Sequence, residues 1–72
     1  MTLEQAKRGQ KLVVTGIGNE TVRVLAIRFG ICEGIAVTCR EVIPAGPVII
    51  SLNDQEIAVG RSLAKHIEVR PC

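Results

Sequence analysis

One histidine and three cysteines are the side chains in this sequence best suited to nucleophilic or metal chemistry. His66 stands alone, and Cys32, Cys39 and Cys72 form no Cys-x-x-Cys pair. A nucleophile needs a base within hydrogen-bond reach, and that base needs a third group to orient it. Cys39 instead lies in a run that alternates apolar and polar residues, where a free cysteine is typically a small core residue. The sequence therefore predicts no catalytic residues and a protein that is not an enzyme.

The same residues form a poor set of metal ligands. Structural zinc sites use four ligands in closely spaced pairs, whereas Cys32, Glu33, His66 and Cys72 have no such spacing. The segment Gly16-Ile17-Gly18 precedes a predicted helix, but it lacks the third glycine of a dinucleotide-binding loop and the lysine of a phosphate-binding loop. We therefore predict no metal site and no bound cofactor.

Composition argues against several further classes of protein. The 72 residues include 9 basic and 7 acidic ones, for a formal charge of +2, and Phe29 is the only aromatic residue. Binding of single-stranded nucleic acid relies on aromatic stacking and on concentrated positive charge, so it is not expected here. A membrane-spanning helix needs about 20 apolar residues, and the longest apolar stretch, Val42 to Ile50, is broken by two prolines and a glycine. The first ten residues contain no apolar signal core, so we expect a cytoplasmic protein with no membrane insertion.

One amphipathic helix is predicted over residues 20–29. Asn19 is a favourable N-cap, and Glu20 suits the positive end of the helix dipole. Gly30 is typical of the residue that ends a helix in the left-handed conformation. The face with i, i+3, i+4, i+7 spacing, which we expect to pack against the core, consists of Val22, Leu25, Ala26 and Phe29.

Two apolar residues of this helix do not fit that face. At 100° per residue, Val24 and Ile27 lie about 200° and 140° around the helix from Val22, and Arg23 and Arg28 flank them. One interpretation is a partner-binding surface made of Arg23, Val24, Ile27 and Arg28, through which the chain could also self-associate. The alternatives are isolated surface aliphatics, which are common, or a helix that packs more of its circumference.

The remaining segments predict a mainly β protein. Two short helical turns are expected, near 2–7, where Thr2 and Gln5 fit a capping box and Gly9 follows as a helix-ending residue, and near 62–66. Residues 44–47 and Asn53-Asp54 have the composition of turns. Runs of strand-forming residues occupy 11–17, 35–40, 48–52, 55–59 and 67–69. Five short strands and one inserted helix favour a small barrel, with residues 1–72 forming a single domain.

The chain as a whole resembles the FeoA family of the bacterial ferrous iron transport system. The resemblance begins at Leu3 and Gly9, continues through Phe29-Gly30-Ile31 at the end of the predicted helix, and includes Gly34. It then follows a proline- and glycine-containing turn and a closing pattern of apolar residues. These residues are Pro44, Gly46, Pro47, Ile57, Ala58, Val59, Ala64, Ile67 and Val69. The chain departs from the family pattern at two positions, with Phe29 in place of a leucine and Glu33 in place of a proline. In addition, its turn at Pro44–Pro47 is one residue shorter than that of the family.

This resemblance implies an SH3-like β-barrel with an inserted helix. It further implies a non-catalytic accessory protein that contacts FeoB, the membrane ferrous iron transporter, through the transporter's cytosolic domain. The chain would then lie at the inner face of the membrane through its partner. Two alternatives stay open: a metal-sensing domain of the kind found at the C-terminus of iron-dependent repressors, and a nucleic-acid-binding barrel. Neither a DNA-reading helix nor an aromatic platform supports them.

Overall fold

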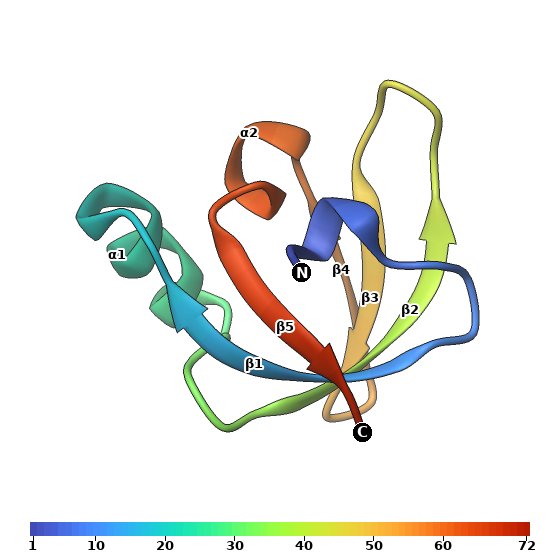
Figure 1. Ribbon diagram of the computed structural model, residues 1–72, viewed down its shortest axis with the longest axis horizontal. Helices are drawn as coiled ribbons and strands as arrows, with labels where there is room; N and C mark the ends of the chain where they lie inside the picture. The colour runs from blue at the N-terminus through green and yellow to red at the C-terminus, as the bar shows by residue number, and fades with distance from the viewer.

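The computed structural model describes residues 1–72 as one antiparallel five-stranded sheet with a helix inserted after the first strand (Figure 1). The strand order is β4-β3-β2-β1-β5, and the sheet curls strongly so that the helix α2 links the two edge strands. The mainly β fold with one inserted helix is therefore confirmed. The elements are η1 (Leu3–Gln5), β1 (Lys11–Ile17), α1 (Glu20–Arg28), β2 (Ala36–Val42), β3 (Val48–Leu52), β4 (Gln55–Val59), α2 (Arg61–Ala64) and β5 (Ile67–Pro71).

Two tight turns connect the strands in the second half of the sheet and determine how they pair. Asn53 and Asp54 have φ of 48° and 67°, as a two-residue hairpin requires, and Leu52 pairs with Gln55 across it. This confirms the predicted hairpin. In the turn between β2 and β3, the Gly46 N–H donates to the Ile43 carbonyl over 2.8 Å, and Ala45 adopts a φ of 55°.

The N-terminal segment covers the outer edge of β5. Thr2 forms an isolated bridge with Glu68, and the Val69 N–H donates to the Met1 carbonyl over 2.8 Å. The capping interaction is present, because the Thr2 N–H donates to Gln5 Oε1 over 2.8 Å. The helical turn is nevertheless shorter than predicted, a 3-10 turn of three residues that ends at Gln5.

Gly9 does not end that turn, contrary to the prediction. It has a φ of 86°, and its N–H donates to the Cys39 carbonyl over 2.7 Å, while the Cys39 N–H donates to Gln10 over 2.8 Å. Two residues of this chain segment thus oppose one residue of β2, which is the pattern of a β-bulge with glycine in the left-handed position. A helix-ending glycine and a bulge glycine share the same requirement for positive φ, so the local sequence does not distinguish them.

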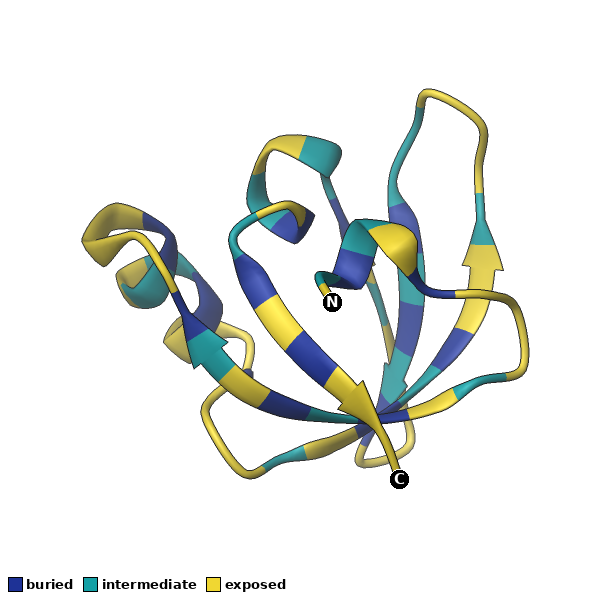
Figure 2. Cartoon of the chain, in the orientation of Figure 1, coloured by how far each residue is buried: buried dark blue, intermediate teal, exposed yellow.

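A single apolar core lies inside the curled sheet. Seventeen residues are buried and all of them are hydrophobic. Figure 2 shows buried and exposed residues alternating along β5, and along β3 buried residues alternate with half-buried ones. Val37 and Cys39 point into this core, which confirms the expected burial of Cys39. The second helical turn begins one residue before the predicted range and ends two residues before its end, and β5 extends two residues beyond its predicted end.

Arg61, at the start of α2, joins three distant segments through backbone carbonyls. Its Nε donates to Gly46 over 2.8 Å, its Nη2 donates to Ile43 over 3.1 Å, and its Nη1 lies 3.5 Å from the Glu4 carbonyl. The side chain therefore connects the turn between β2 and β3 to α2, and more weakly to η1. None of the helices is long and apolar enough to cross a membrane.

Candidate functional site: the outer face of helix α1

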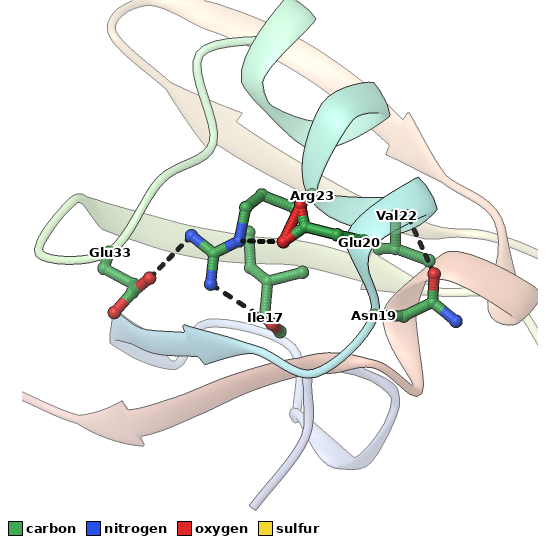
Figure 3. Close-up of polar contacts among 6 residues, drawn as sticks. All are labelled: Ile17, Asn19, Glu20, Val22, Arg23 and Glu33. Carbon is green, nitrogen blue, oxygen red and sulfur yellow. Dashed lines mark hydrogen bonds and ion pairs between the residues drawn. The ribbon is translucent and has the colours of Figure 1, made fainter.

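Local interactions define both ends of α1. The Val22 N–H donates to Asn19 Oδ1 over 3.1 Å, which confirms the predicted N-cap (Figure 3). At the other end the Phe29 N–H donates to Ala26 over 3.0 Å, and Gly30 follows with a φ of 85°. The predicted range therefore holds to within one residue, with Phe29 acting as the C-cap.

Burial fixes which side of the helix faces outward. Val22 and Ala26 are 6% and 3% exposed and pack into the core. Val24 and Ile27, on the far side, are 54% and 56% exposed. Single exposed aliphatics are ordinary, but here two of them share one helix face and each leaves more than half of its surface in water. This is the face on which partner binding was predicted.

Arg23 has partners within the chain. Its Nη1 donates to Glu33 Oε1 over 2.8 Å, its Nη2 donates to the Ile17 carbonyl over 3.4 Å, and Nε lies 3.7 Å from Glu20 (Figure 3). The hydrogen bond that Arg23 donates to Glu33 and the charge of that carboxylate raise the pKa of the Arg23 guanidinium. Arg23 thus joins the first turn of α1 to the end of β1 and to the loop after the helix.

Arg28 differs from Arg23 in being exposed, and it has no carboxylate within ion-pair distance. It lies in the last turn of α1, where its positive charge interacts favourably with the negative end of the helix dipole. The structure therefore leaves Val24, Ile27 and Arg28 free on one surface and engages Arg23 at its margin. Partner binding by these four residues remains a prediction.

Phe29 departs from the predicted core-facing stripe. It is 52% exposed, although its spacing placed it with Val22 and Ala26. As the C-cap, it has φ and ψ of −95° and 2°, so it no longer follows the helical spiral. Phe29 forms one wall of a narrow apolar hollow between α1 and the strand β4, with a free volume of about 10 Å³. The hollow is lined by Val22, Ala26, Phe29, Ile31, Ile57, Ala58, Val59, Leu63 and Ile67.

This hollow lies on the side of α1 that carries Val22 and Ala26, so it is separate from the face of Val24 and Ile27. Its walls come from four segments of the chain, so helical periodicity alone did not reveal it. The available sequence signal was Phe29 itself, a lone aromatic directly before a helix-ending glycine. A volume this small holds about one water molecule, so the hollow is too small to be a pocket for a small molecule.

The histidine and the three cysteines do not gather into a metal-binding group in the fold. The structure contains no group of three or more histidine, cysteine, aspartate or glutamate side chains placed to hold a metal ion. Cys32 and Cys72 are exposed, whereas Cys39 is buried, and removal from water raises the pKa of the Cys39 thiol. His66 is half-buried at the junction of α2 and β5. The absence of catalysis, metal and cofactor thus stays a prediction.

Comparison with known proteins gives a consistent family assignment. A family model described as the FeoA domain matches residues 1–71. No curated protein matches the chain. A crystal structure of an iron uptake regulatory protein (FeoA) is 31% identical, covers the whole of both chains and superposes with a TM-score of 0.90.

More distant structures show how widely the fold occurs. FeoA of Stenotrophomonas maltophilia, complexed with zinc and described as a procaryotic SH3 domain protein, is 21% identical with a TM-score of 0.80, over 97% of this chain and 89% of that one. The manganese regulator SloR is 15% identical with a TM-score of 0.90, and the match covers all of this chain but 34% of that one. Since both identities are low, these likenesses establish the SH3-like fold alone.

Proposed function

The chain belongs to the FeoA family of small accessory domains with a role in ferrous iron transport, and from this premise we propose that it binds an FeoB-type membrane ferrous iron transporter. The contact is with the transporter's cytosolic domain, and residues 1–72 act as one non-catalytic unit that modulates transport or assembly. The protein is cytoplasmic and reaches the inner face of the membrane through this partner.

The exposed outer face of α1 is the observation that carries this proposal. Val24 and Ile27 are each more than half exposed, and Arg28 adds an unpaired charge at the rim. Contact surfaces of this kind combine an apolar centre, in which few residues carry most of the binding energy, with a polar rim. Arg23 acts indirectly by holding the helix against β1 and the following loop.

A binding assay with the isolated cytosolic domain of FeoB tests the proposal, run without nucleotide, with GDP and with a GTP analogue. Val24→Glu and Ile27→Glu should each weaken binding about tenfold or more, because a charge replaces a central apolar contact. Ile43→Glu is a matched control, since Ile43 is also exposed, at 41%, but lies in the turn between β2 and β3. Equal loss in all three variants, or no complex in any nucleotide state, would contradict the proposed contact.

The same surface could instead join two copies of the chain. Sedimentation velocity of the protein alone distinguishes the two cases, because Val24→Glu would then lower the association constant without any transporter present. Self-association that survives Val24→Glu excludes α1 as the self-contact.

Metal sensing is the second candidate function, favoured by the likeness of the fold to that of the manganese regulator. His66 and Cys32 are the ligands that this alternative would use. A stoichiometric Fe²⁺ site that His66→Ala or Cys32→Ser abolishes would support it. Absence of saturable Fe²⁺ binding would leave the accessory role as the proposal.

A further inference from the structure

Most of the basic side chains gather at the end of the molecule opposite α1. Of nine lysines and arginines, only Arg23 forms an ion pair, and Arg61 is bound to backbone carbonyls. The other seven have no carboxylate within ion-pair distance. Five of these seven lie in the loop before β1, in β1, in β2 and at the end of β5, and all five are exposed: Lys7, Arg8, Lys11, Arg40 and Arg70.

The bulge at Gly9 brings two of these arginines together. Because Gly9 and Gln10 both bond to Cys39, the residues on either side of that junction, Arg8 and Arg40, lie beside one another. Both line the same open hollow of about 450 Å³ on the outside of the sheet. Cys39 also lines this hollow, but its side chain is buried in the core and is not available to a ligand there.

Strand register places two more cations next to this pair. Lys11 lies opposite Thr38, which precedes Arg40 by two residues, and Val13 lies opposite Arg70. Side chains two residues apart on a strand share one face, and diagonal neighbours across strands come within reach of long side chains. Lys11 therefore lies diagonally across from Arg40 of β2 and from Arg70 of β5, on the outer face of the sheet.

Acidic residues interrupt this surface without neutralising it. Glu41 and Glu56 also line the hollow, and Glu68 precedes Arg70 on the same face of β5. None of the three comes within 4.0 Å of a basic side chain. Five cations against three carboxylates leave a local excess of two positive charges, which accounts for the whole formal charge of the chain, +2, because the remaining charges cancel.

We propose that this basic surface binds the phosphate-bearing head groups of an anionic lipid membrane. Guanidinium groups recognise phosphate through paired hydrogen bonds, and Arg8 and Arg40 face one hollow that is open enough for a head group. The remaining cations strengthen the attraction of the surface to a negatively charged leaflet.

Lipid is favoured over nucleic acid for two reasons. Phe29, the only aromatic residue, lies at the end of α1 and gives the basic surface no base-stacking platform. The second reason is that the proposed partner, FeoB, is itself a membrane protein. The preference for lipid therefore rests on the proposed function, whereas the basic surface itself does not. Figure 1 shows α1 at one end of the long axis of the molecule and the loop before β1 at the other. A chain attached through its basic end therefore keeps Val24 and Ile27 free.

Vesicle sedimentation without any transporter tests this inference. The protein should bind vesicles in which a third of the lipid is phosphatidylglycerol, bind pure phosphatidylcholine vesicles far less, and dissociate as ionic strength rises. Each cation removed from the surface should lower the partition coefficient about fivefold. Arg8→Gln combined with Arg40→Gln should therefore lower it about 25-fold. The control removes one charge elsewhere, with Lys65→Gln, and should change the coefficient less than about twofold, whereas Arg8→Gln alone should lower it about fivefold.

Three results would overturn the proposal. They are no binding to anionic vesicles at low salt, an equal loss in the control variant, and tighter binding to inorganic phosphate or to an RNA oligonucleotide than to vesicles. Because all substituted side chains are exposed, unfolding curves should match that of the wild type and confirm that each variant is folded. Since no transporter is present, failure here leaves the α1 contact untouched, and failure of the FeoB assay leaves the vesicle result intact.

Discussion

The contact made by Arg61 gives the most sharply defined stability prediction. The Arg61 guanidinium donates to Gly46 over 2.8 Å and to Ile43 over 3.1 Å, whereas the 3.5 Å approach to Glu4 is at the limit of a hydrogen bond. The Ile43 carbonyl also accepts from the Gly46 N–H, but the Gly46 carbonyl has Arg61 as its only donor. Removing the side chain therefore breaks two good hydrogen bonds and leaves one carbonyl without a protein partner.

The expected magnitude follows from burial. Hydrogen bonds from a charged donor contribute roughly 1.5–3 kcal/mol each when they are well buried. Arg61 is only half-buried, and the turn that it holds is largely exposed, so water replaces part of what is lost. We expect Arg61→Ala to lower the free energy of unfolding by about 1–2 kcal/mol. In a chain of 72 residues this corresponds to a fall in Tm of about 5–15 °C.

Arg61→Lys separates the geometry of the contact from its charge. A lysine ammonium keeps the positive charge but cannot present two parallel N–H groups to two carbonyls. We expect it to recover less than half of the stability lost in Arg61→Ala. Lys65→Ala, in an exposed position directly after α2, should change the free energy of unfolding by less than about 0.5 kcal/mol.

Urea denaturation measures these differences, and hydrogen exchange at the Gly46 amide locates them. The turn bond from Gly46 to Ile43 should open more often in Arg61→Ala, so the Gly46 amide should exchange faster while the amides of β1 change only with global stability. If Arg61→Lys is as stable as the wild type, the paired hydrogen bonds are not the source of stability. If Arg61→Ala is also unchanged, the contact contributes nothing.

Two further predictions concern backbone strain and thiol reactivity. Ala45→Gly should raise the free energy of unfolding by about 0.5–1 kcal/mol, because Ala45 has a φ of 55° that glycine adopts without cost, and a loss of stability on urea denaturation would contradict this. At pH 8, alkylation should modify Cys32 and Cys72 quickly and Cys39 slowly, whereas all three should react alike in denaturant. Burial raises the pKa of the Cys39 thiol above its ordinary value, so the stability that the neutral thiol contributes is lost as the pH rises through this raised pKa. Rapid modification of all three thiols in the native protein would refute the burial of Cys39.

Locally encoded features were predictable from the sequence. Strands β3 and β4 begin and end as predicted, because apolar alternation and the residues of the Asn53-Asp54 turn specify the same hairpin. The helix α1 was predicted to within one residue, since its N-cap Asn19 and its terminal Gly30 act within their own turns. These are interactions between residues three or four positions apart, and short-range patterns report them directly.

Features that depend on distant segments were not predictable in the same way. Gly9 was expected to end a helix, but its role is set by Cys39, thirty residues later. Arg61 contacts the carbonyl of Gly46, fifteen residues earlier, and a surface arginine carries no signal that it will do so. Phe29 had helical spacing but is the residue at which the helical backbone ends, so its side chain turned toward the surface.

The exposure of Val24 and Ile27 is a consequence of several independent constraints. Val22 and Ala26 fix the rotation of α1 by their burial, and Arg23 fixes it again from the side by binding Glu33 and the Ile17 carbonyl. Turning the helix to bury Val24 or Ile27 would expose the first pair and break these bonds at the same time.

If the exposure of Val24 and Ile27 had no function, a single one of these constraints would be enough to explain it. The burial of Val22 and Ala26 alone already determines the face, so the Arg23 contacts add rigidity to a helix whose direction is already set. Rigid presentation lowers the entropy lost when a partner binds. This is why we propose the outer face of α1, and not the turn at Ile43, which is also exposed, as the surface that binds the transporter.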